Sequence, residues 1–145
     1  ASMMAMGEDG YMERVEKIIE CRKRLGKEVA SMPGLHLMGT PQAMIICFAS
    51  EDYNIYRVSD KMSHKGWSLN TLQRPACIHL CVTLRTVENE ARFTKDLRAC
   101  VDEVIEEGNN VVLGGNAAIY GMSGSMPAGP VSELLKTYTD VMLTP

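Results

Sequence analysis

The order of helical and extended patterns along this chain predicts an α+β fold in which helices pack on a small sheet, a two-layer sandwich. The apolar residues alternate between helical spacing and short continuous runs, in the order helix, two strands, helix, two strands, helix, helix. The chain has 145 residues, of which 46% are hydrophobic and 23% charged. This size and composition are typical of one globular domain that buries a sizeable core.

Apolar residues at helical spacing predict three helices before the glycine-rich region. The first covers residues 11–30 and ends at Pro33-Gly34. The second covers residues 53–65, with Ser50 or Asp52 as its N-cap. The third covers residues 87–107, and its inward stripe is Val87, Ala91, Leu97, Val101 and Val104.

Short apolar runs predict the strands. Residues 35–38 form a short alternating piece, and residues 43–49 form a continuous apolar run that is expected to be buried on both faces. Two further strands are expected at residues 67–72 and 77–84, separated by Arg74-Pro75. Such short runs between turn residues are the pattern of strands.

The two ends of the chain differ from its middle. Residues 1–10 are expected to be the tail of a severed segment between domains, because Ala1–Met6 is apolar and has no cap or turn. Residues 108–129 are rich in Gly, Asn, Ser and Pro and predict a loop. Pro130 then opens a terminal helix over residues 130–142. Residues 1–145 are therefore interpreted as a single domain.

Charge and cysteine content exclude some functions. The net charge of −3 gives no basic surface for nucleic acid. No apolar run reaches the roughly 20 residues that cross a bilayer. The five cysteines form no paired spacing, which favours free thiols in a reducing compartment. Cys77, His79 and Cys81 share one strand face, where they could hold a metal; small apolar thiols on a buried sheet face are the favoured interpretation, and no metal is expected.

No standard catalytic or nucleotide-binding signature is present, so the candidate site comes from local context. Tyr120 and the following Gly121 lie in the glycine-rich region, where a backbone can approach a ligand closely. The alternative is a tyrosine that packs the loop onto the sheet. Arg74 lies between two strands, where a cation can meet an anionic partner or remain solvated. Trp67 is interpreted as a core residue.

Several segments together resemble the C-terminal part of the sphingosine-1-phosphate lyase family, pyridoxal-phosphate enzymes among the group II decarboxylases. The run Lys65-Gly66-Trp67-Ser68-Leu69-Asn70 and the run Asn116-Ala117-Ala118-Ile119-Tyr120-Gly121 are the most specific. The remaining segments that carry the resemblance are Gly7–Tyr11, Ser50–Tyr56, Thr71–Gln73, Pro75, Ile78–Leu84 and Val131–Leu134. The resemblance covers essentially the whole chain.

The resemblance implies the small C-terminal domain of a fold-type-I homodimer. Such an enzyme uses pyridoxal 5'-phosphate to cleave a phosphorylated sphingoid base into a fatty aldehyde and phosphoethanolamine. It implies that the aldimine lysine belongs to a His-Lys pair of the large domain; Lys65 follows His64 but matches the small domain instead. The chain is therefore expected to be inactive by itself and to bring Tyr120, Gly121 and Arg74 to the substrate.

The resemblance also implies a location at the cytosolic face, with attachment to the endoplasmic reticulum membrane through a segment outside this chain. Two other functions remain open. One is a domain of a pyridoxal-phosphate amino-acid decarboxylase, against which residues 66–70 argue. The other is a free-standing binding or regulatory module without catalysis. A severed domain would expose the surface that packs on its large partner, which predicts self-association.

Overall fold

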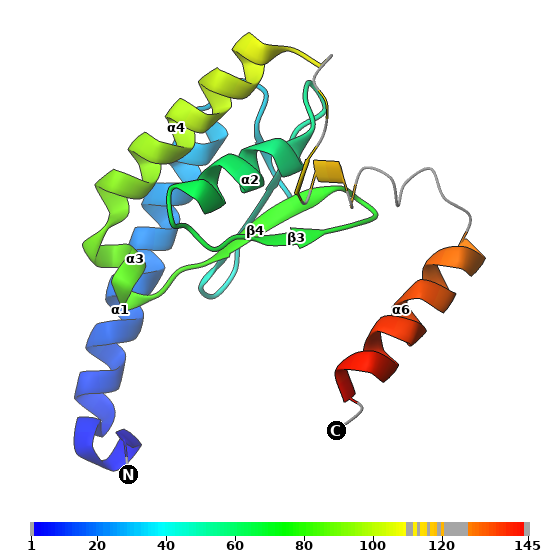
Figure 1. Ribbon diagram of the computed structural model, residues 1–145. Coiled ribbons are helices and arrows are strands. Elements are labelled where there is room, and N and C mark those ends of the chain that lie inside the picture. Colours follow the sequence, from blue (N-terminus) through cyan, green and yellow to red (C-terminus); the bar gives the residue numbers. More distant parts are fainter. Residues whose placement is uncertain are drawn as a thin grey trace.

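The computed structural model describes residues 2–109, 112, 114, 115, 117, 118, 120 and 128–143. At its centre is a four-stranded antiparallel sheet with the strand order β1-β2-β4-β3. The strands are β1 (His36–Leu37), β2 (Ile45–Ala49), β3 (Asn70–Leu72) and β4 (Cys77–Cys81). Figure 1 shows β3 and β4 as a hairpin beside the helices.

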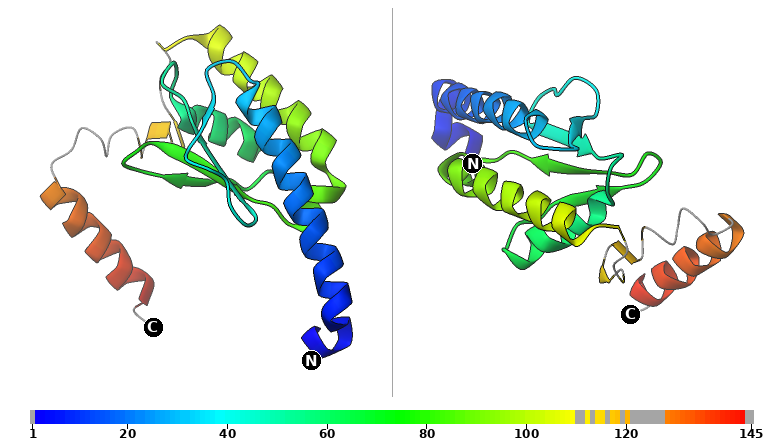
Figure 2. Two further views of the ribbon diagram at one scale, coloured as in Figure 1. Left: turned by 180° about the vertical axis from the view of Figure 1, so that it is seen from behind. Right: turned by 90° about the horizontal axis from the view of Figure 1, so that it is seen from above.

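The helices are α1 (Ser2–Ala30), α2 (Ile55–His64), α3 (Leu84–Glu88), α4 (Glu90–Glu107) and α6 (Ala128–Leu143). Helix α1 contacts β1 and β2, α2 contacts β3 and β4, and α4 packs against both α1 and α2. In Figures 1 and 2, α6 lies apart from this body. A small antiparallel sheet packed with helices confirms the predicted α+β class.

The core lies between the helices and one face of the sheet. Strand β2 contributes Ile46 and Phe48, whose register partners on β4 are Leu80 and Ile78, and all four are buried. The helices supply the opposing side chains, including Leu25, Val29, Val58, Met62, Phe93, Leu97, Val101 and Val104. Each fully buried side chain of this size contributes about 1.5–3 kcal/mol of hydrophobic stabilisation. This core positions α2, which carries the candidate site.

The opposite face of the sheet is more open, so the expected burial of β2 on both faces is wrong. Ile45 is 43% exposed, and Cys47 is only half-buried. On β4, Cys81 is exposed while Cys77 is buried, so the expectation of a buried thiol face holds only for part of the strand. An antiparallel sheet can leave one face in contact with water, so a continuous apolar run does not require a strand to be covered on both faces.

Two helix starts differ from the predictions. Helix α1 begins at Ser2, and Gly7 interrupts it with φ 67° and ψ 171°. Helix α2 is capped by Asn54, whose Oδ1 accepts the backbone N–H of Tyr56 at 3.0 Å. The predicted cap Ser50 instead accepts the N–H of Tyr53 at 3.3 Å in the preceding turn. Several capping side chains were close enough in sequence to compete, and the backbone geometry selects Asn54.

The single helix expected over residues 87–107 is two helices. A capping box between Thr83 and Thr86 starts α3, and Asn89, at φ −116°, separates it from α4. Ala91 is exposed, so its place in the inward stripe is wrong, and Phe93 is buried instead. Trp67 is only half-buried and packs against the core edge rather than inside it.

The region predicted as a loop over residues 108–129 contains helical residues at 115, 117, 118 and 120. Helix α6 begins two residues before the predicted start, at Ala128, with Pro130 in its first turn where a missing N–H is tolerated. Among the described residues, no helix is both long enough and apolar enough to cross a bilayer.

Candidate functional site

Tyr120 is held against α2 by an aromatic contact. Its ring centroid lies 5.2 Å from that of Tyr56, and the two planes are tilted by 34°. Tyr120 is half-buried and packs against the edge of the core. Offset or tilted aromatic pairs at this distance are attractive. The ring of Tyr120 is therefore restrained while part of it remains accessible.

Tyr56 is itself fixed at its hydroxyl end. The O–H of Tyr56 donates to the carbonyl oxygen of Leu72 at 2.7 Å, which joins α2 to the end of β3. Burial raises the pKa of the Tyr56 phenol, and the neighbouring Cys77 and Tyr120 add to the rise. Tyr56 therefore remains a neutral hydrogen-bond donor at physiological pH and forms a rigid support for Tyr120.

Asp60 holds the segment that leads to Tyr120. It lies one helical turn after Tyr56 on α2, and its Oδ2 accepts the backbone N–H of Ala117 at 3.0 Å. Gly115 has φ +54°, and a Cβ there would lie 3.0 Å from the Asp60 carboxylate. Position 115 thus favours glycine for both its backbone conformation and its closeness to Asp60. Helix α2 contacts the segment at two points, Asp60 on Ala117 and Tyr56 on Tyr120.

Arg74 lies in the tight turn between β3 and β4, with φ 57° and a cis peptide bond to Pro75. Its side chain is exposed, and no ion pair to it is found among the described residues. Because Tyr56 contacts both Tyr120 and Leu72, two residues before Arg74, the structure brings Tyr120 and the Arg74 hairpin to the same end of α2. Gly121, the third predicted site residue, lies outside the described residues.

A charged cluster anchors the other side of this segment. Arg57 is 7% exposed and binds the carbonyl of Gly108 and the Glu107 carboxylate, the latter at 2.7 Å. Lys61 donates to Glu107 at 2.7 Å and to Glu103 at 3.0 Å. Hydrogen bonds from Lys61, and then Arg57, hold the pKa of Glu107 below its usual value. The cluster therefore ties the end of α4 to α2, where the glycine-rich region begins.

These charged side chains border a cavity of about 370 Å³ that also reaches Gly114, Gly115 and Ala117. Sequence reasoning missed the roles of Tyr56 and Asp60 in this region. Their i, i+4 spacing places them on the same face of α2, which is the signal that could have found them. The buried apolar residues of α2, which give the helix its periodic pattern, are instead Ile55, Val58 and Met62.

The lysines of the chain are all at least partly exposed. All seven lie among the described residues, and none is buried (Lys17, Lys23, Lys27, Lys61, Lys65, Lys95 and Lys136). A nucleophilic lysine needs a lowered pKa, whereas hydrogen bonds to Glu107 and Glu103 raise the pKa of Lys61. Nζ of Lys65 lies 4.0 Å from a carboxylate oxygen of Glu103.

Burial disfavours the thiolate form of three cysteines. Burial raises the pKa of Cys21 to about 12 and that of Cys100 to about 11. Burial and a hydrogen bond to Cys77 raise the pKa of Cys47 to about 11. Thiolates are the reactive form, so these thiols are inert at neutral pH. Within the described ranges, no three His, Cys, Asp or Glu side chains are grouped so as to hold a metal.

Comparison with known proteins shows the ancestry of this chain. It is 43% identical over 141 residues, 97% of its length, to a sphingosine-1-phosphate lyase of Arabidopsis thaliana. It is 34% identical over 99% of its length to sphingosine-1-phosphate lyase 1 of Mus musculus. Among solved structures, a sphingosine-1-phosphate lyase of Burkholderia pseudomallei matches 70% of the chain with a TM-score of 0.66 and 32% identity. The chain belongs to the sphingosine-1-phosphate lyase family.

The structure of the cystine C-S lyase C-DES matches 63% of the chain, with a TM-score of 0.52 and 22% identity. A likeness at this identity supports the fold alone. A related C-DES structure carries glycine linked to a pyridoxal-phosphate cofactor. No protein-family model matches the chain. The chain spans about a quarter of the length of its curated relatives, 26% of both the Arabidopsis and the mouse proteins.

Proposed function

We propose that this chain is the C-terminal small domain of a pyridoxal-phosphate carbon–carbon lyase that acts on phosphorylated sphingoid bases. The products would be a fatty aldehyde and phosphoethanolamine. The observation that carries the proposal is the match of nearly the whole chain to sphingosine-1-phosphate lyases, at 31–43% identity. Since the chain covers only a quarter of those proteins, a larger partner domain would supply the rest of the enzyme.

The cofactor would be bound by that large domain. None of the seven lysines here is buried, which supports a chain that is inactive by itself. Pyridoxal 5'-phosphate, when bound to the complete enzyme, supplies the electron-withdrawing ring for bond cleavage. This domain would instead provide one wall of the site, and a homodimer located at the cytosolic face of the endoplasmic reticulum would be the working form.

Tyr120 would be the substrate-contacting residue of this wall, and Gly121 would continue it. The phenol could donate a hydrogen bond to the substrate or carry a proton to it, which needs a ring held at a fixed place. Tyr56 and Asp60 support that placement, because they restrain the ring and the backbone before it. Arg74, exposed at the same end of α2, would bind the substrate phosphate with its planar guanidinium.

The test compares three proteins: this chain, the complete native protein that contains it, and the complete protein with Tyr120→Phe. Release of fatty aldehyde from a phosphorylated sphingoid base is measured for each. We expect no turnover by this chain, turnover by the complete protein, and a kcat roughly 100-fold lower for the variant, the usual scale of a lost proton-transfer group.

Other outcomes would contradict the proposal. Turnover by the isolated chain would refute the need for a large domain. Release of carbon dioxide from amino acids, without aldehyde release, would favour the decarboxylase. A native product near 16 kDa, detected in source cells with an antibody to this chain, would favour a free-standing module. An unchanged kcat for Tyr120→Phe would remove Tyr120 from the mechanism while leaving the family activity intact.

A further inference from the structure

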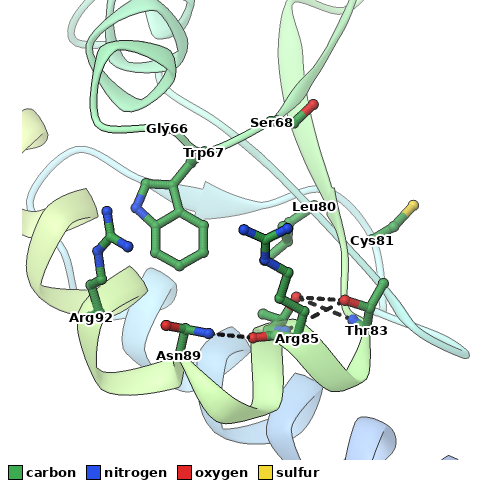
Figure 3. Close-up of a pocket in the computed structure, with 10 residues that line it drawn as sticks. Gly66, Trp67, Ser68, Leu80, Cys81, Thr83, Arg85, Asn89 and Arg92 are labelled. Carbon is green, nitrogen blue, oxygen red and sulfur yellow. Dashed lines mark hydrogen bonds between the residues drawn. The ribbon is translucent and has the colours of Figure 1, made fainter.

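A second pocket lies at the opposite end of α2 from Tyr56, and the proposed function does not use it. It is a cavity of about 270 Å³ bordered by three segments. The first segment is residues 66–68, which follow α2. The second is the end of β4 and the residues after it, and the third is formed by α3 and the start of α4. Figure 3 shows the Trp67 indole in the middle of this pocket. The cavity is large enough for a small ligand rather than for a single water.

The lining carries two arginines and no carboxylate. Arg85 comes from α3 and Arg92 from α4, and Figure 3 shows their guanidinium groups on opposite sides of the Trp67 ring. The guanidinium of Arg92 lies 5.3 Å from the Trp67 ring centroid, within cation–π range. Two cations that line one cleft repel each other, and an anion bound in the cleft relieves that repulsion.

The surrounding acids do not neutralise both arginines. Asp96 lies 3.4 Å from Nε of Arg92 and also accepts the Trp67 indole N–H at 2.8 Å. Glu90, which starts α4, is engaged instead by Arg24, with N–O distances of 2.7 and 2.8 Å. Glu88, on α3, is exposed and does not border the cavity.

Arg85 is the distinctive group of this pocket. Its guanidinium has no hydrogen bond or ion pair to any described residue. Its backbone is nevertheless held, because Asn89 Nδ2 donates to the Arg85 carbonyl at 2.9 Å. Arg92 is also positioned, by a 3.0 Å hydrogen bond to the carbonyl of Lys65. The pocket is thus lined by one guanidinium without a partner among the described residues and by a second, already oriented one on the other side of the Trp67 ring.

We propose that this pocket binds the phosphate group of a phosphate monoester. A guanidinium presents a planar fork of donors that matches phosphate oxygens. One guanidinium can donate to both oxygens of a carboxylate. A tetrahedral phosphate has a third oxygen, which can accept a hydrogen bond from a second arginine. The same headgroup could come from a soluble phosphate ester or from a lipid phosphate at a membrane surface, and the two sources share this recognition. The inference does not depend on lyase activity.

Trp67 makes the proposal directly measurable, because it is the only tryptophan of the chain and lines the pocket. The isolated chain is titrated with inorganic phosphate and with glycerol phosphate at constant ionic strength, and Trp67 fluorescence is recorded. Isothermal calorimetry repeats each titration independently of the fluorophore. Vesicles of phosphatidylcholine with and without phosphatidic acid test the lipid source by co-sedimentation.

We expect saturable binding that weakens roughly ten- to hundredfold in Arg85→Ala, the loss typical of one charge-assisted hydrogen-bonding group. Arg85→Lys, which keeps the charge but loses the fork, should bind with intermediate affinity. Arg98→Ala is the matched control: Arg98 is an exposed arginine on α4 that lies outside the pocket and faces Glu28 at 3.4 Å. It should bind as the unsubstituted chain does. Because Arg85 is exposed, its substitution should leave the urea midpoint unchanged.

Binding of soluble phosphates, or of phosphatidic acid vesicles alone, supports the site and identifies the source. The proposal is overturned if neither source binds by calorimetry or sedimentation. It is also overturned if acetate gives the same response as phosphate, or if Arg85→Ala and Arg98→Ala weaken binding equally. If Arg85→Ala fails to fold, Arg85→Lys is the deciding variant. Phosphate affinity and preference over acetate equal to those of the unsubstituted chain would contradict recognition by the planar guanidinium of Arg85.

Discussion

Asp60→Ala is the substitution that most directly tests how the Tyr120 segment is held. The change removes the carboxylate oxygen that accepts the Ala117 N–H at 3.0 Å. Hydrogen bonds to charged groups contribute about 1.5–3 kcal/mol. Because Asp60 is half-buried, a value near the lower end is expected, about 1.5–2 kcal/mol. Each 1.4 kcal/mol is about a factor of ten in an equilibrium constant, so local opening at Ala117 should increase roughly ten- to thirtyfold.

The assay is hydrogen exchange of the Ala117 amide, followed by NMR on the isotopically labelled chain. Asp60→Asn keeps an acceptor oxygen but removes the charge, so it should recover much of the protection. Ser63→Ala is the matched control, because Ser63 is on the same helix and borders the same cavity, and Ala117 bonds to Asp60 instead. Amides in the centre of α4 report global unfolding and should exchange at nearly unchanged rates.

Equal Ala117 exchange in Asp60→Ala and in the unsubstituted chain would refute this hydrogen bond as a restraint. Faster exchange throughout α4 as well would mean that Asp60 stabilises the whole fold rather than the segment. In the complete enzyme, the same reasoning predicts a lower kcat for Asp60→Ala, with partial recovery in Asp60→Asn.

Three further predictions concern the core, the ion pairs and the thiols. Phe48→Ala should lower the free energy of unfolding by about 3–5 kcal/mol, measured by urea denaturation, because the ring is fully buried; a loss below 1 kcal/mol would contradict its place in the core. Hydrogen bonding by Arg24 lowers the pKa of Glu90 in the folded state. This stabilisation is present above the unfolded pKa and is lost as the pH falls through the folded one. Glu90→Gln should therefore reduce the loss of stability between pH 7 and pH 3, and an unchanged acid profile would argue against the pair. Iodoacetamide at pH 8 should modify exposed Cys81 first and leave buried Cys21 intact, as read by peptide mass spectrometry; equal labelling of both would contradict their burial.

Local pattern was sufficient to predict much of the fold. Apolar spacing predicted α2 and most of α1, and turn residues separated β3 from β4, because helical and extended periodicities depend mainly on neighbouring residues. The boundaries were less accurate where several caps compete. Asn54 rather than Ser50 starts α2, and the Thr83–Thr86 capping box produces a separate α3.

By itself, the sequence determined the α+β class, the resemblance to the lyase family, and the choice of Tyr120 and Arg74 as candidate residues. Only the tertiary structure decided which surfaces are open and which partners hold Tyr120. Tyr56 meets Tyr120 across 64 positions of chain, and Asp60 meets Ala117 across 57. Contacts at such separations depend on how α2 packs against the sheet and α4. No local pattern encodes that packing, so the support of Tyr120 and the two-arginine pocket became apparent only in three dimensions.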